Sequence, residues 1–176
     1  MGKSELYDDI FFVWKGNSGA ISSNDGIFTE IVDFQIPRGY AIRVRKVIVD
    51  FQINADQADQ EYFRMLTALV LDPDDETSTQ IPTFTIDHDV CADFAFEFFR
   101  IEEDTTPNGI SGLTSRRTEI VFPEELDVVS IRNARVNTIV GGMAVGGDNE
   151  AQTRMTIYFT YEKVSTSLYE KLLGIK

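Results

Sequence analysis

Runs of β-branched and aromatic residues recur along this chain, and each run is closed by Gly, Pro, Asn or Asp. This pattern is typical of strands separated by turns. The clearest alternation lies in the last run, where the residues on one face are Met155, Ile157, Phe159 and Tyr161. The predicted strands are 10–15, 27–36, 40–53, 62–71, 81–86, 94–101, 118–122, 126–132, 136–145 and 151–163.

The long strand predicted at 40–53 changes parity in its middle. Ile42 and Val44 share one parity, and the apolar residues after them take the other parity, namely Val47, Val49, Phe51 and Ile53. A β-bulge near Arg45 and Lys46 would bring both sets to one face, and bulges bend long strands as sandwiches require. The alternative is that the two ends of the strand bury opposite faces.

Two further segments carry expectations about exposure. The run 94–101 places phenylalanines on both of its faces, which favours a position near a sheet centre or under a partner subunit. The segment 102–117 is rich in Thr, Gly, Ser and Asn. Its length predicts a long loop and the first candidate for an exposed tip.

The end of the chain predicts a short helix. Ser167 and Glu170 match a capping box, and Gly174 suits the end of the helix. A helix this short must dock on its own sandwich or on a neighbouring copy. The apolar residues on one side of it are Leu168, Leu172 and Leu173.

Together these elements predict an all-β fold, an antiparallel two-sheet jelly-roll sandwich of about eight or nine strands with a short C-terminal helix. The length of 176 residues suits one domain, 1–176, with an N-terminal arm at 1–9 and a helical tail at 165–176. An immunoglobulin-like sandwich would leave nearly the same pattern. The single cysteine, Cys91, excludes an internal disulfide and reads as a half-buried apolar residue.

The net charge of the chain disfavours anionic partners. The formal net charge is −13, from 29 acidic and 16 basic residues, so the average field repels phosphate and anionic lipid. Direct nucleic-acid binding is therefore disfavoured. No segment has the apolar character of a signal peptide or a membrane span, so we expect the chain to be made in the cytoplasm.

No constellation in the sequence predicts catalysis. The only histidine, His88, stands between Asp87 and Asp89, but adjacent residues of a strand point to opposite faces and could not share one metal ion. A catalytic triad is disfavoured because the sequence has no Gly-x-Ser-x-Gly turn and His88 is the only imidazole. The glycine-rich stretch 141–147 lacks the Lys of a phosphate-binding loop. We therefore predict no enzyme activity, no cofactor and no metal, with a structural calcium at 72–76 as an alternative.

Basic residues on this acidic chain occur in islands. The densest is Arg43, Arg45 and Lys46, and the others are Arg116 with Arg117, and Arg132, Arg135 and Arg154. Such islands suit acidic patches on a neighbouring copy. The predicted assembly contacts are Arg43, Arg45, Lys46, Leu168, Leu172 and Leu173.

The turn at 34–39 leading into a long strand, and the closing strand at 158–163 with its short helix, resemble the single jelly-roll coat proteins of tailless icosahedral viruses of archaea and bacteria. The resemblance implies a structural capsid protein of the virion that self-assembles into a shell with copies of itself and other capsid proteins. It also implies proximity to an internal viral membrane. The alternatives are a carbohydrate- or ligand-binding sandwich, a spike or decoration protein, and an enzyme whose site is assembled from acidic loops.

Overall fold

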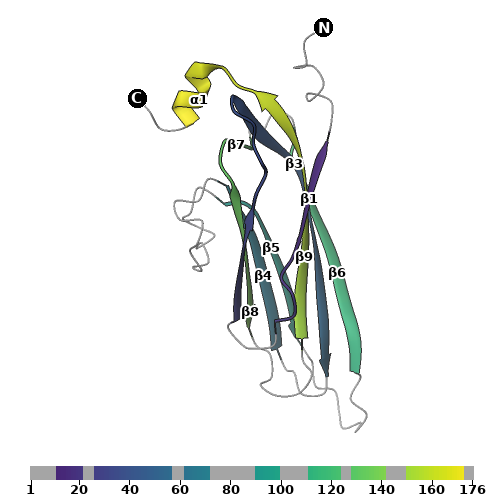
Figure 1. Ribbon diagram of the computed structural model, residues 1–176. Helices are drawn as coiled ribbons and strands as arrows, with labels where there is room; N and C mark the ends of the chain where they lie inside the picture. The colour runs from purple at the N-terminus through teal and green to yellow at the C-terminus, as the bar shows by residue number, and fades with distance from the viewer. Residues whose placement is uncertain are drawn as a thin grey trace.

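The computed structural model of the protein describes residues 11–21, 26–56, 62–71, 90–99, 111–123, 128–141 and 150–172. These residues form two antiparallel sheets that face each other, with one short helix beyond the end of the last strand (Figure 1). The elements are β1 (Phe12–Asn17), β2 (Gly26–Val32), β3 (Tyr40–Asp56), β4 (Tyr62–Leu71), β5 (Val90–Phe99), β6 (Ser111–Val121), β7 (Val129–Ser130), β8 (Ala134–Gly141), β9 (Glu150–Lys163) and α1 (Thr166–Leu172).

The strand pairing is nested along the chain. Sheet A has the order β1-β9-β3-β6, with β7 also paired to β3, and sheet B has the order β2-β8-β4-β5. The first strand thus pairs with the last, β2 with β8, β3 with β6, and β4 with β5. Pairing of β3 and β4 with β9 and β8 completes the sheets. The predicted all-β antiparallel two-sheet sandwich is confirmed.

The core lies between the two sheets and follows the alternation of the strands. On β9 the predicted inward residues are all buried, namely Met155, Ile157, Phe159 and Tyr161. The Phe34 ring packs edge-on against Phe159 with centroids 4.9 Å apart, and Phe51 of sheet A stacks on Phe96 of sheet B at 6.0 Å. Aromatic pairs of this geometry add to the stabilisation from burial.

The predicted bulge in β3 is confirmed. The register with β9 shifts between Val44 and Lys46, which leaves Arg45 as the extra residue. Because of this extra residue, Val44 and Val47 both face the interior and both belong to the core cluster. The parity change in the sequence therefore marks one buried face and not two.

A chain of hydroxyl groups crosses the core. Thr67 of β4 and Thr138 of β8 lie 3.1 Å apart at their Oγ1 atoms, and Thr138 lies 3.0 Å from Thr153 of β9 in the opposite sheet. All three side chains are buried, and their mutual hydrogen bonds satisfy the polar atoms. These hydrogen bonds add a directional contact between the two sheets to the apolar packing of the core.

The predicted turn before β3 is confirmed. The Tyr40 amide donates to the Pro37 carbonyl at 3.0 Å, and Gly39 has φ +80°. A positive φ at the third residue of such a turn is that of a type II turn, which favours glycine there.

Three predictions about elements are wrong. Residues 111–117 are strand and not loop, because they pair along the far half of the long β3, and β3 itself continues through Asn54 to Asp56. Strand β5 lies at the edge of sheet B, so the prediction of a position near the sheet centre is wrong. Asp93 and Ala95 on its other face are exposed, and burial of this strand under a partner subunit stays a prediction. Other boundaries differ by a few residues, and the strand predicted at 81–86 lies outside the described residues.

The helix begins earlier than predicted. The Tyr169 amide donates to the Ser165 carbonyl at 2.9 Å, so Ser165 occupies the capping position and Ser167 lies inside the first turn. The predicted capping box at Ser167 is therefore wrong. In the part of the chain that the structure describes, no helix has the length and apolar character needed to cross a membrane.

Candidate functional site

The sequence-predicted basic cluster, Arg43, Arg45 and Lys46, lies on β3, and its charges are opposed within the chain. Arg43 donates from Nε and from one terminal nitrogen to the two carboxylate oxygens of Glu162, the second contact at 2.8 Å. Arg45 reaches the same carboxylate at 3.4 Å, and Lys46 Nζ lies 2.7 Å from Glu119 Oε2. The hydrogen bond and positive charge of Lys46 lower the pKa of Glu119.

These contacts bear on the predicted role of the cluster in assembly. A bidentate arginine–carboxylate pair is among the stronger charged contacts, and side chains held in it are already oriented and neutralised. The cluster stays a predicted assembly contact. However, its own chain already supplies the acidic partners that a neighbouring copy was expected to provide.

The other predicted site residues are placed only in part. Leu168 and Leu172 lie in α1, and Leu173 falls outside the described residues, as do His88 and the acidic stretch 72–76. Arg154 lies on β9 in sheet A, whereas Arg135 lies on β8 in sheet B, so the third basic island is divided between the sheets. Within the described ranges, no group of three His, Cys, Asp or Glu side chains could hold a metal ion.

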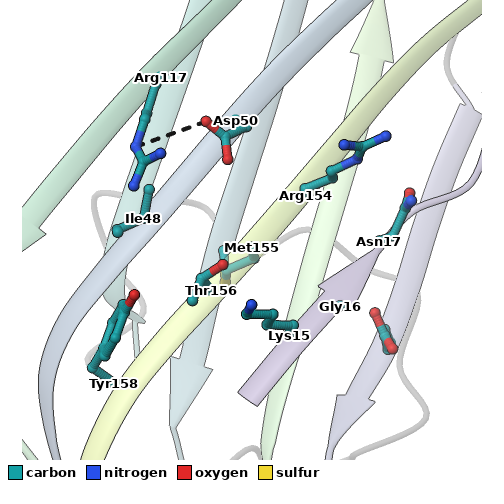
Figure 2. A pocket seen from close by; sticks show the side chains of 11 residues that line it. Lys15, Gly16, Asn17, Ile48, Asp50, Arg117, Arg154, Met155, Thr156 and Tyr158 are labelled. Atoms are coloured by element: carbon teal, nitrogen blue, oxygen red, sulfur yellow. Dashed lines mark ion pairs between the residues drawn. The ribbon is translucent and has the colours of Figure 1, made fainter. Parts of the chain in front are cut away.

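A hollow of about 550 Å³ on sheet A brings together residues that the sequence scatters. It is named here the sheet A hollow. Its lining residues come mainly from neighbouring positions of β1, β9, β3 and β6, as Figure 2 shows. They are Lys15, Gly16, Asn17, Glu30, Ile48, Asp50, Arg117, Arg154, Met155, Thr156 and Tyr158.

The strand register explains this gathering. Directly opposite residues of antiparallel strands share a face, and one row across the sheet reads Asn17, Arg154, Asp50 and Arg117. The next row reads Lys15, Thr156, Ile48 and Glu119. Both rows lie on the face away from the core, because the alternating residues Val47 and Val49 are buried inside the sandwich.

The charges of the hollow are unevenly matched. Arg117 Nε lies 3.9 Å from Asp50 Oδ1, a loose contact at the limit of an ion pair, and both side chains are largely exposed. Within the described part of the chain, Lys15 and Arg154 make no ion pair, and Figure 2 shows the Arg154 guanidinium turned away from Asp50. The lining therefore holds three cationic side chains, Lys15, Arg117 and Arg154, against two carboxylates, Asp50 and Glu30.

The floor and the side of the hollow differ in polarity. Ile48 is only 3% exposed, although it lies on the outer face, and half-buried Thr156 and Tyr158 place their side chains beside it. The hollow thus combines a small apolar floor with two hydroxyl groups, the Asn17 side-chain amide, two carboxylates and three cationic side chains. Its lining is therefore mainly polar.

Gly16 forms part of the β1 edge of the hollow, and its lack of a side chain is required. A Cβ at this position would overlap the Trp14 ring and would lie 2.5 Å from Glu30 Oε2. Burial raises the pKa of Glu30, an effect opposed in part by a hydrogen bond from the Asn17 backbone. The Glu30 carboxylate of β2 is thus packed closely against the backbone of β1.

The thiol of Cys91 is not set up as a nucleophile. Cys91 on β5 is half-buried, as the sequence predicted, and burial raises the pKa of its thiol to about 12. The thiolate is the reactive form, so this cysteine is almost wholly in the inert form near neutral pH.

Sequence reasoning named only part of the hollow. It recorded Arg117 and Arg154 as members of separate basic islands, and it missed Lys15, Asp50 and Tyr158. The signal that unites them is the register of four strands, and two of those strands are more than a hundred residues apart in the chain. No local pattern carries that register.

Neither a protein-family model nor a curated protein matches this chain.

Proposed function

We propose that this chain is a self-assembling structural protein, a coat subunit of a viral shell built on a single jelly roll, acting in the virion with copies of itself and other capsid proteins. The nested strand pairing supports the jelly-roll interpretation. A long antiparallel ribbon, with its first strand paired to its last, gives this order of sheets when it is rolled up. An immunoglobulin-like sandwich instead places more consecutive strands side by side in one sheet.

The observation that carries self-assembly is the exposure of large apolar side chains at opposite edges of sheet A. Phe11 and Val13, at the β1 edge, are 62% and 45% exposed, and Val121, at the β6 edge, is 62% exposed. Exposed apolar groups at an edge favour burial against a partner. Because the two edges differ, contact between them joins copies head to tail, which closes into rings or shells where the rotation permits.

The experiment is measurement of mass and shape by light scattering and negative-stain microscopy over a range of protein and salt concentrations. Defined rings, trimers or shells are the expected result. The variant Val121→Asp places a charge at the β6 edge and should reduce assembly. Ile31→Asp is the matched control, because it introduces the same charge at an exposed apolar residue of sheet B.

A persistent monomer at high concentration would overturn the proposed function. Equal loss of assembly in Val121→Asp and Ile31→Asp would remove the edge argument, because it would show an effect of charge alone.

A carbohydrate- or ligand-binding module is the second candidate. It is favoured by the sheet A hollow, whose size lies within the usual range of about 300–1,000 Å³ for small-ligand sites. This function becomes the first candidate if the protein stays monomeric.

A further inference from the structure

The sheet A hollow exposes cationic side chains on a chain whose net charge is strongly negative. Two copies with a net charge of −13 repel each other at long range, and this repulsion opposes assembly unless local contacts of opposite charge offset it. On β3 the basic residues are already paired with Glu162 and Glu119. Lys15 and Arg154 of the hollow lack such partners within the described residues and stand exposed on the same face of the sheet.

We propose that the sheet A hollow binds a short carboxylate-rich segment of a second copy of this chain, with Arg154 and Lys15 receiving the carboxylates. The inference rests on the proposed function, since it names the contact by which acidic copies would join. Arginine suits this role because its planar donor fork matches a carboxylate, and lysine adds a compact charge nearby.

The shape of the hollow favours a short segment. Its volume of about 550 Å³ is that of a small-ligand site and not of a broad flat interface. The adjacent row of the sheet ends in Glu119, which is already paired with Lys46, so this row offers no unpaired cation to a polyanion that extends past the hollow. A long nucleic acid or a membrane surface therefore fits this face less well than a few carboxylates do.

The copies themselves carry suitable segments. The stretch 72–76 has the sequence Asp-Pro-Asp-Asp-Glu, which places four carboxylates within five residues. Beside the cations, the Asn17 amide and the hydroxyls of Thr156 and Tyr158 can hydrogen-bond to the backbone of such a segment. Figure 2 shows Lys15, Thr156 and Tyr158 along the same side of the sheet as Arg154.

The test uses the full chain and a fluorescent synthetic peptide with the sequence of residues 71–78, in a titration by fluorescence anisotropy at low salt. We expect saturable binding that weakens as salt is added, because the contact is between exposed charges. A peptide with every carboxylate replaced by its amide should not bind. Arg154→Ala should weaken binding about fivefold, and the double variant with Lys15→Ala should bind still more weakly.

Matched controls separate the hollow from the overall charge. Arg132→Ala and Lys163→Ala remove the same charges from exposed residues outside the hollow, and they should leave binding unchanged. Arg154→Lys keeps the charge and should retain part of the affinity. Thermal melts of all variants establish that they are folded.

Light scattering on the same variants separates this inference from the proposed function. Loss of both peptide binding and assembly in the Lys15 and Arg154 double variant supports the inference. Assembly that is unchanged in this variant, without peptide binding to the native chain, overturns the inference and leaves the proposed function standing. Peptide binding by a persistent monomer supports the carboxylate site and overturns the shell function. Tighter binding of oligogalacturonate than of the peptide overturns the assignment of the hollow to protein and favours an acidic saccharide.

Discussion

Two groups of cations share the outer face of sheet A and differ in what opposes them. The β3 basic cluster of Arg43, Arg45 and Lys46 is dense in the sequence, and the carboxylates of Glu162 and Glu119 neutralise it within the fold. The cations of the sheet A hollow are scattered in the sequence and only loosely matched by Asp50. Density of charge along a chain therefore does not indicate which charges stay available to a partner. The cross-strand register decides this, because it determines which carboxylate lies opposite each cation.

The largest expected effect comes from a change at the edge of the hollow. Gly16→Ala places a Cβ against the Trp14 ring and the Glu30 carboxylate, both of which must move. Overpacking of this kind costs about 1–3 kcal/mol of the free energy of unfolding. Urea denaturation of the variant measures this loss.

Relief of the same clash provides the control for Gly16→Ala. The ring atoms of Trp14 nearest to the added Cβ are those that a phenylalanine ring lacks. The double variant Gly16→Ala with Trp14→Phe should therefore lose less stability than the sum of the two single variants. Simple additivity would contradict the role of Gly16 as the residue that accommodates the indole.

The second effect concerns the β3 cluster. Glu162→Gln removes the carboxylate that holds both Arg43 and Arg45, and Arg43 is 18% exposed at its side chain. Loss of a partly buried charged hydrogen-bond pair should cost about 1–2 kcal/mol of the free energy of unfolding. The substitution also removes the carboxylate that faces Arg45, so the acidic peptide of residues 71–78 should gain a second place to bind. Denaturation and peptide titration measure the two consequences.

Glu119→Gln is the matched control for Glu162→Gln, because it changes an exposed carboxylate that pairs with Lys46. It should destabilise the fold less. The pKa of Glu119 is lowered from 4.5, so its contribution is present above that value and is lost as the pH falls through the folded-state pKa. A larger loss of stability in Glu119→Gln than in Glu162→Gln would contradict the distinction between a bidentate, partly buried pair and an exposed one.

How far the sequence predicts the molecule depends on the range of each interaction. Alternation along 151–163 and the parity change at Arg45 are local, and both gave the buried face correctly. The strand at 111–117 could not be recognised, because its residues are polar and become strand through pairing with β3. The hollow was beyond local patterns for the same reason. Its row of Asn17, Arg154, Asp50 and Arg117 exists only after four distant segments align.

The smallest expected effect tests whether Glu30 compensates the cations of the hollow. Burial raises the pKa of Glu30 above 4.5, so the folded state disfavours its ionised form. The contribution of Glu30 to the free energy of unfolding is therefore fully present below about pH 4.5 and decreases as the pH rises through its folded-state pKa. Glu30→Gln keeps an oxygen that can accept a hydrogen bond from the Asn17 backbone N–H, and it removes the charge.

We expect the free energy of unfolding of Glu30→Gln to equal that of the native chain in acid. Near pH 7 it should exceed the native value by less than about 1 kcal/mol, after allowance for solvent screening. Paired urea titrations at the two pH values measure this difference. Tighter binding of the acidic peptide by the variant should accompany it, because one negative charge leaves the lining. If Glu30→Gln is instead less stable than the native chain near neutral pH, the ionised Glu30 is held by the cations of the hollow, and the contrast between a neutralised cluster and an uncompensated hollow fails.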